Sequence, residues 1–320
     1  MTDNQSSVIR SPITDYRSPS LLLVGTGALA SLFGARLAAA GVHVTMLGSW
    51  PEGLAALRQH GVRLVEADGS EHMYPVRAVA DPAECRGIRH ALVLVKAWQT
   101  GRAAEQLAAC LPADGLALTL QNGWGNRETL EQALGPGRVA LGVTTLGATL
   151  LAPGVVRLGG QGPVTLGHHP RIQPLAELLA AAGCDVRMAE DVAGLAWGKL
   201  VINAAINPLT ALLRVPNGEL LERPEARELM GLAAREAATV GLAQGLHLPF
   251  ADPVAAAEDV ARRTAANHSS MFQDVLRGRP TEIDAICGAV VQAGERLGVS
   301  TPVNRMLWLL VRATSAPLVE

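Results

Sequence analysis

A short apolar strand followed at once by glycines constrains the fold of this chain more than any other feature. Leu21-Leu22-Leu23-Val24 is uninterrupted apolar sequence, Gly25-Thr26-Gly27 follows directly, a helical pattern continues through Leu37, and a second apolar run covers 42–47. A strand that is apolar on both faces is typical of the centre of a parallel sheet covered on two sides. Strand, helix and strand in this order join by a right-handed crossover. The chain is therefore predicted to open with a parallel α/β unit.

The glycines fit the dinucleotide-binding pattern G-x-G-x-x-A, and both the strand before and the helix after are in place. Gly25 would make the turn, Gly27 would let a pyrophosphate approach the backbone, and Ala30 with Gly34 would allow close helix–strand contact. The phosphates would lie on the helix N-terminus, where free N–H groups favour an anion. The predicted cofactor-binding residues are Gly25, Thr26, Gly27, Ala28, Leu29 and Ala30.

The end of the second strand bears on which dinucleotide is bound. An Asp or Glu there would bind the ribose of NAD, and an Arg would bind the extra phosphate of NADP. Leu47-Gly48-Ser49-Trp50 offers only the Ser49 hydroxyl, and Glu52 and Arg58 lie further on. Because no carboxylate repels a 2′-phosphate, the sequence favours NADPH and leaves NAD open as an alternative.

The chain divides into two parts of different character. Strand and helix signals alternate up to 189, and after Asp191 they give way to long helical segments rich in Ala, Leu, Glu and Arg. We expect a flexible tail over 1–19, a dinucleotide-binding Rossmann domain over 20–189 and a helical substrate and catalytic domain over 190–320. The expected first-half elements are strands at 91–95, 116–120, 139–144, 154–158, 164–166 and 184–188, helices at 52–59, 100–110 and 175–182, and a hairpin-like stretch at 62–79. Amphipathic helical segments are expected at 220–246, 253–273, 283–297 and 305–313.

Charge and cysteine usage exclude several function classes. The net charge of −2 gives no basic field for nucleic acid or an anionic membrane, and Lys, Arg, Asn or Pro interrupts every long apolar run, so no membrane span is predicted. The first nineteen residues lack the apolar core of a signal peptide. Four cysteines stand far apart, without Cys-x-x-Cys or His at zinc spacing. They indicate buried thiols in the cytoplasm and no metal site.

Lys199, Asn203 and Asn207 place one cation and two amides in an otherwise apolar helical stretch. Their i, i+4, i+8 spacing puts all three on one helical face, aimed at one cleft. Such a wall suits a small oxyanion. In the alternative interpretation the asparagines cap or cross-link helices and Lys199 reaches water past its apolar stem.

Other polar residues stand where a ligand could bind. Lys96 and Asn122 follow the strands ending at Val95 and Leu120, and ligands bind at the carboxyl ends of parallel strands; ordinary loop chemistry is the alternative. Ser270 and Glu282 belong to polar clusters on apolar elements. In the alternative interpretation the Ser270 hydroxyl bonds to its own helix backbone, and Glu282 belongs to the start of a helix.

In combination these segments resemble the ketopantoate reductase (2-dehydropantoate 2-reductase) family. The resemblance runs from Leu21 to about Val311 and rests on GTGALA, VKAWQT, QNGWG, WGKLVINAAINPLTALL, VPNGEL and NHSSMFQDVLRGRPTEID, in that order. It implies an N-terminal Rossmann domain, an all-helical C-terminal domain and an active site in the cleft between them. It also implies the NADPH-dependent reduction of ketopantoate to pantoate, a step of pantothenate and coenzyme A biosynthesis.

The resemblance assigns roles to individual residues. It implies that Lys199 and Glu282 are catalytic and that Lys96 and Asn122 lie near the nicotinamide and its ribose. The family's second strand usually ends with an arginine for the NADP phosphate, where this chain has Ser49. The implied substrate-binding residues are Asn122, Asn203, Asn207, Asn217 and Ser270.

Two other functions stay open. One is a related reductase acting on a different 2-keto acid, since fold and fingerprint do not fix the substrate. The other is a dinucleotide-binding regulatory protein without turnover. The presence of both Lys199 and Glu282 argues against this second alternative. The oligomeric state is left open, a homodimer being one option.

Overall fold

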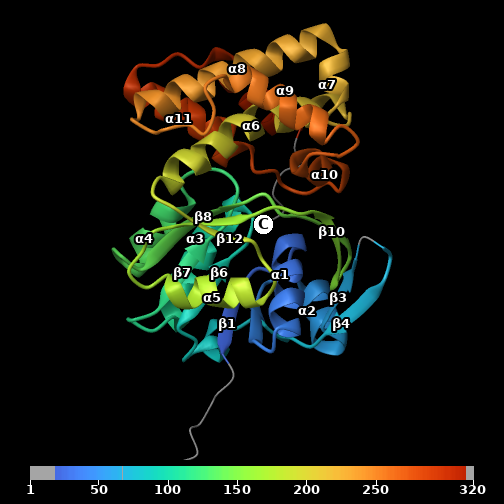
Figure 1. Ribbon diagram of the computed structural model, residues 1–320, viewed down its shortest axis with the longest axis vertical. Helices are drawn as coiled ribbons and strands as arrows, with labels where there is room; N and C mark the ends of the chain where they lie inside the picture. Colours follow the sequence, from blue (N-terminus) through green and yellow to red (C-terminus); the bar gives the residue numbers. More distant parts are fainter. Residues whose placement is uncertain (1–18, 67, 315–320) are drawn as a thin grey trace, which may run out of the picture.

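The fold is described by a computed structural model that covers residues 19–66 and 68–314. The tail expected over 1–19 lies outside the described residues except for Pro19. Figure 1 shows a sheet domain with a helical domain seated on top of it. The prediction of a parallel α/β half followed by an all-helical half is confirmed.

The main sheet has eight strands in the order β12-β11-β8-β7-β6-β1-β2-β5. The pairs from β5 to β8 are parallel, whereas β11 pairs antiparallel to β8, so β11 and β12 run against the others. An all-parallel sheet was expected. After β8 the chain leaves the main sheet at its carboxyl edge, forms an excursion outside this sheet and returns at the same edge. β11 therefore runs antiparallel to β8. The strands are β1 (Ser20–Val24), β2 (His43–Leu47), β5 (Arg77–Val79), β6 (His90–Val93), β7 (Leu116–Thr119), β8 (Val139–Thr144), β11 (Val164–Gly167) and β12 (Val186–Ala189).

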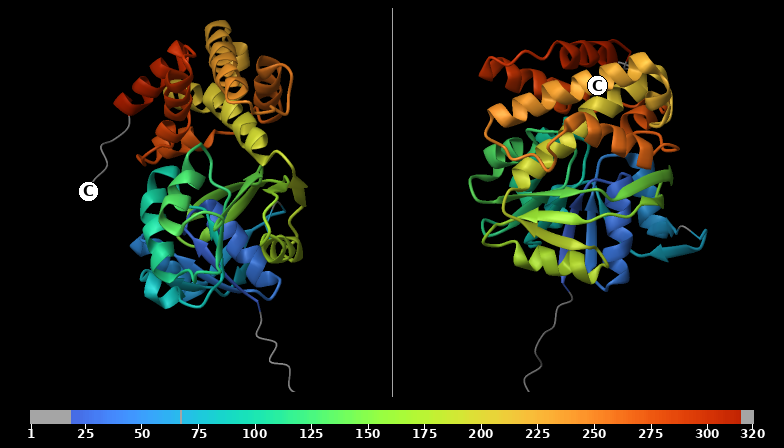
Figure 2. Two further views of the ribbon diagram at one scale, coloured as in Figure 1. Left: turned by 90° about the vertical axis from the view of Figure 1, so that its left-hand side faces the viewer. Right: turned by 45° about the horizontal axis from the view of Figure 1, so that its top comes forward.

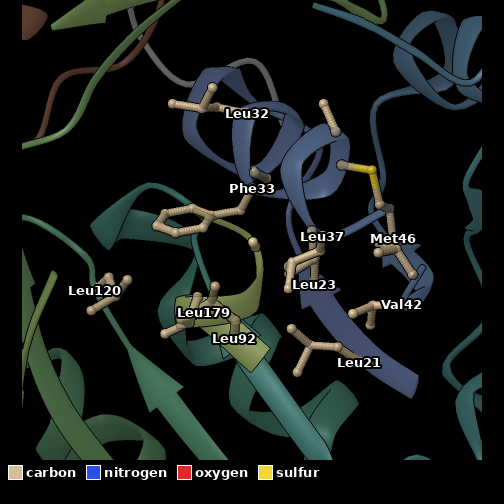
Figure 3. Close-up of a cluster of buried hydrophobic side chains, with 14 of the residues drawn as sticks. Leu21, Leu23, Leu32, Phe33, Leu37, Val42, Met46, Leu92, Leu120 and Leu179 are labelled. Atoms are coloured by element: carbon tan, nitrogen blue, oxygen red, sulfur yellow. The ribbon is translucent and has the colours of Figure 1, made fainter. Parts of the chain in front are cut away.

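Alternate residues of β1 enter two hydrophobic clusters on opposite faces of the sheet. Leu21 and Leu23 pack with Phe33 on one face, whereas Leu22 and Val24 pack with Leu107 on the other. Figure 3 shows the first cluster between α1 and the sheet. These four apolar side chains are at most 1% exposed, and burying each one stabilises the fold by about 1.5–3 kcal/mol. The helices of this domain are α1 (Ala28–Ala39), α2 (Pro51–His60), η1 (Pro82–Cys85), η2 (Ala97–Gln99), α3 (Thr100–Cys110), α4 (Asn126–Leu134) and α5 (Gln173–Ala181).

A second sheet has four strands in the order β4-β3-β10-β9, and its strands β9 and β10 form the excursion between β8 and β11. The hairpin-like stretch at 62–79 supplies β3 and β4, which pair antiparallel as expected. The strand expected at 154–158 is β10, and it belongs to this second sheet, where it pairs with β3 and with β9, a strand that was not predicted. The strands are β3 (Val62–Val65), β4 (Glu71–Tyr74), β9 (Gly147–Ala152) and β10 (Val155–Gly160).

The helical domain is built around one long helix. α6 is long and apolar enough to cross a membrane by composition, but 61% of that stretch is buried inside the protein. It packs against α8, α9, α10 and α12 and is the core helix of this domain. The helices are α6 (Val192–Leu213), α7 (Glu219–Glu222), α8 (Pro224–Ala243), α9 (Pro253–Arg263), α10 (Ser270–Leu276), η3 (Ile283–Ala285), α11 (Cys287–Leu297) and α12 (Pro302–Thr314).

The continuous helix expected over 253–273 is wrong, because α9 ends at Arg263 and α10 starts at Ser270. The Ser269 hydroxyl accepts the Phe272 N–H at 3.1 Å and so caps α10. A Ser at this position satisfies an N–H that would otherwise lack a partner, which favours a new helix start over continuation.

The helical domain sits on the carboxyl edge of the main sheet, as both views of Figure 2 show. The backbone N–H of Trp124 donates to the Ala285 carbonyl at 2.9 Å. The Trp124 ring contacts the ring of Trp197 in α6 edge-on, with 4.9 Å between the ring centroids. Gly123 has φ +86° and lies so close that a Cβ there would be 2.7 Å from the Ala285 carbonyl oxygen. The QNGWG segment therefore forms one of the contacts between the domains.

Candidate active site between the domains

The glycine loop after β1 has the form a dinucleotide pyrophosphate needs. Gly25 has φ +129°, and a Cβ there would lie 3.2 Å from the Leu94 backbone, so only glycine fits the turn. Gly27 is exposed, has open space where a Cβ would be, and begins α1 without a side-chain cap. The first N–H groups of α1 are thus available to an anion.

The other fingerprint residues support this loop. Thr26 is 7% exposed, and Ala28 and Leu29 are half-buried. Ala30 is fully buried, and a Cβ at Gly34 would lie 3.2 Å from Met46 Sδ, which matches the expected close packing of helix on strand. The loop therefore fits a dinucleotide.

Lys199 and Asn203 of α6 meet Asn122 in one pocket of about 150 Å³ between the domains. Lys199 Nζ donates to the Thr144 carbonyl at 2.6 Å. Asn207, on the same helical face, is 6% exposed and lies outside the lining of this pocket. The pocket thus brings together a cation and two amides. The helical spacing predicted Lys199 and Asn203 there, but the second amide comes from Asn122 and not from Asn207.

Burial lowers the pKa of the Lys199 ammonium to about 8, and the negative charge of Glu282 opposes that shift. An ammonium whose pKa lies near neutrality can both stay protonated and give up its proton. Lys199 therefore has the protonation behaviour of a general acid.

Glu282 directly precedes η3, and its side chain lies against the Rossmann half. Its Oε1 accepts the Ala97 N–H at 2.9 Å, and its Oε2 lies 3.5 Å from Lys96 Nζ. Lys96 Nζ also donates to Asp274 Oδ2 at 2.6 Å. Burial lowers the Lys96 pKa, but the charges of Glu282 and Asp274 outweigh that effect and leave the pKa raised. Lys96 is therefore an ammonium that ties the two domains together.

Asp274 was not singled out from the sequence, although it lies in the NHSSMFQDVLRGRPTEID segment. It is 5% exposed on α10. It stands four residues after Ser270, the half-buried first residue of α10, so the two share a helical face. An acid one turn beyond a suspected site serine is the signal that could have found it.

Asn217 and Ser270 do not line the pocket that contains Lys199. Asn217 is buried after α6, where its Nδ2 donates to Thr264 Oγ1 at 2.8 Å and its Oδ1 has no partner among the described residues. Ser49 is exposed in the loop after β2. All four cysteines are buried and free, as predicted.

We expect Asp274→Asn to destabilise the protein by about 1.5–3 kcal/mol, because it weakens a hydrogen bond between charged groups whose acceptor is buried. Denaturant unfolding measures this. Asp259→Asn is the matched control, since the Asp259–Arg263 pair at 2.9 Å is exposed on both sides and such pairs contribute little. Equal stabilities of the two variants would contradict the anchoring role of Asp274.

The comparisons with known proteins agree with this geometry. Residues 21–171 match the family described as Ketopantoate reductase PanE/ApbA, and residues 191–315 match Ketopantoate reductase PanE/ApbA C terminal. The chain belongs to the ketopantoate reductase family. A 2-dehydropantoate 2-reductase of Halobacterium salinarum is 35% identical to it over 91% of this chain and 97% of the relative.

Solved structures repeat the whole fold. A PanE/ApbA family ketopantoate reductase from Ralstonia eutropha superposes with a TM-score of 0.86 at 32% identity, covering 92% of this chain and 98% of that one. A D-mandelate dehydrogenase solved with NADH and anilino(oxo)acetate reaches the same TM-score at 26% identity, with the same coverage. Proteins with this fold therefore include a reductase and a dehydrogenase, and the dehydrogenase was solved with NADH.

Proposed function

We propose that this protein catalyses the NADPH-dependent reduction of ketopantoate (2-dehydropantoate) to pantoate. The observation that carries the proposal is the buried Lys199 ammonium, with its pKa lowered to about 8, facing Asn122 and Asn203 in the pocket between the domains. Such a group stabilises developing negative charge on a keto oxygen and then donates a proton to it. In this proposal residues 20–189 bind the dinucleotide, and residues 190–320 supply the substrate side.

The remaining residues would orient the substrate. Reduced nicotinamide, when bound at the glycine loop, supplies the hydride. Asn122 and Asn203 offer amide groups to the carboxylate and hydroxyls of a keto acid. Asn207, Asn217 and Ser270 stay proposed substrate-binding residues of the helical domain. Glu282 accepts hydrogen bonds and keeps a negative charge near Lys199.

The assignment of NADPH is supported by the loop after β2. Ser49 is exposed there, and no carboxylate of Gly48-Ser49-Trp50 would repel a 2′-phosphate. The D-mandelate dehydrogenase relative holds NADH, so the two cofactors must be compared directly.

That relative also favours a second candidate, the reduction of another 2-keto acid by the same residues. A steady-state assay that follows NADPH oxidation with ketopantoate, benzoylformate and pyruvate separates the candidates. Highest kcat/KM with ketopantoate supports the proposal, and highest kcat/KM with another keto acid supports the alternative. Dinucleotide binding without turnover of any keto acid would overturn both.

The pH dependence of turnover is a further expected outcome. Because the ammonium form of Lys199 is the proton donor and its pKa is about 8, kcat for reduction should be level below that pH and fall as the pH rises through it. Lys199→Arg should have low activity without this limb, since arginine stays protonated. A wild-type profile that is flat to pH 10 would contradict the role.

A further inference from the structure

Residues 274–282, which we call the strap, contact the sheet domain at two separate loops. Asp274 and Glu282 bond to Lys96 and Ala97, which follow β6. Between them in sequence, the guanidinium carbon of Arg279 lies 5.5 Å from the centre of the Trp50 ring, which follows β2. β1, which carries the glycine loop, lies between β6 and β2 in the sheet. The strap therefore spans the glycine loop, and Figure 1 shows α10 above α1, as this requires.

The Trp50 end of the strap is the adenosine end of the dinucleotide site. In this fold the ribose that carries the 2′ group lies at the end of the second strand, which here is the loop Gly48-Ser49-Trp50. That loop packs on the glycine loop, since a Cβ at Gly48 would lie 2.6 Å from Thr26 Cγ2. Ser49 is exposed and Trp50 half-buried, so a 2′ group placed there would lie next to the Trp50 ring.

Arg279 is a cation whose donors are unused. Within residues 19–66 and 68–314, the guanidinium of Arg279 makes no hydrogen bond or salt bridge, and its side chain makes one cation–π contact, with the ring of Trp50. A cation–π contact uses the charge of a guanidinium and not its N–H donors, so these donors remain available to an acceptor. These donors match the oxygens of a phosphate in a two-bond geometry.

Neighbouring arginines are committed elsewhere. Arg58 Nε donates to the Ala78 carbonyl at 2.9 Å, and it stands seven residues after Pro51, about 10 Å along α2 from the end that faces the ribose. Arg277, in the strap itself, donates to the Leu150 carbonyl at 3.4 Å.

We propose that Arg279, supplied by the helical domain, binds the 2′-phosphate of NADPH and takes the place of an arginine in the loop that carries Ser49. This inference rests on the proposed function only in taking a reduced dinucleotide as the ligand. Because the phosphate belongs to a molecule held by the sheet domain, NADPH links the two domains at this end and NADH does not. The cofactor preference is then set across the cleft.

Calorimetric titration of the full chain with NADPH and with NADH tests the proposal. Arg279→Gln should weaken NADPH binding about 10-fold or more, as expected for the loss of charge-assisted hydrogen bonds, and should change NADH affinity about two-fold at most. Arg279→Lys keeps the charge without the planar fork and should retain part of the preference. Arg277→Gln is the matched control from the same strap and should leave the ratio of the two dissociation constants unchanged.

Each outcome decides a separate question. An NADPH to NADH ratio that is the same in wild type and Arg279→Gln overturns the Arg279 proposal, even if the enzyme reduces ketopantoate normally. Adding Ser49→Arg to Arg279→Gln should restore the ratio, because it returns a cation to the same phosphate from the other side of the site. A wild type that binds neither dinucleotide contradicts the proposed function instead.

Discussion

Lys199→Ala should lower kcat by about 10²-fold or more, the loss expected for a general acid, and should leave the protein folded. Lys199 is held in the pocket by one hydrogen bond to the Thr144 carbonyl, and burial disfavours its charge. Removing a buried ammonium relieves that cost, so the melting temperature should not fall by more than a few degrees. Stopped-flow or steady-state turnover with ketopantoate, together with thermal unfolding, measures both quantities.

A control variant on the same helix separates chemistry from packing. Asn207→Ala changes a buried α6 residue outside the lining of the Lys199 pocket, and we expect it to affect stability or KM more than kcat. Near-normal kcat in Lys199→Ala would remove Lys199 from the mechanism. Equal losses of kcat in both variants would show that disturbing α6 alone is enough.

The scarcity of lysine in the sequence pointed to both lysines of the domain interface, whereas the helical spacing pointed to Lys199 alone. The chain has 27 Lys and Arg residues, of which only Lys96 and Lys199 are lysines. Both lie at the interface of the two domains. Arginine remains charged when buried, whereas the pKa of lysine moves with its surroundings; here the pKa is lowered at Lys199 and raised at Lys96.

Local sequence determined the glycine loop, because its strand, turn and helix each carry their own signal within a few residues. The spacing of Lys199 and Asn203 likewise placed them on one face of α6. The second sheet could not be predicted in the same way. β3 pairs with β10, about 90 residues later in the chain, and β10 ends in glycines that carry no alternating apolar pattern.

Contacts across the cleft could not be predicted from the sequence for a similar reason. Lys96 and Asp274 are 178 residues apart, and nothing local to either residue states that α10 faces the loop after β6. The motif match singled out Glu282 but not its partners. The Ala97 N–H and the Lys96 ammonium had to be located in three dimensions.

Glu282→Gln should lower kcat/KM for ketopantoate by about 10²-fold and should move the alkaline limb of the pH profile to lower pH. The Glu282 charge raises the Lys199 pKa against the effect of burial, so its removal lets that pKa fall below about 8 and Lys199 loses its proton earlier. Glutamine keeps an oxygen that can accept the Ala97 N–H, so domain contact and dinucleotide affinity should change little.

Two measurements distinguish this electrostatic role from a structural one. The kcat profile against pH reports the shift of the Lys199 limb, and calorimetry reports NADPH affinity. Glu282→Ala, which also loses the Ala97 contact, should show the same limb shift with an added loss of stability. If Glu282→Gln loses activity while the limb stays in place, Glu282 acts on the substrate alone and not through the Lys199 proton. If NADPH affinity falls as far as activity does, Glu282 serves mainly to hold the strap against the dinucleotide.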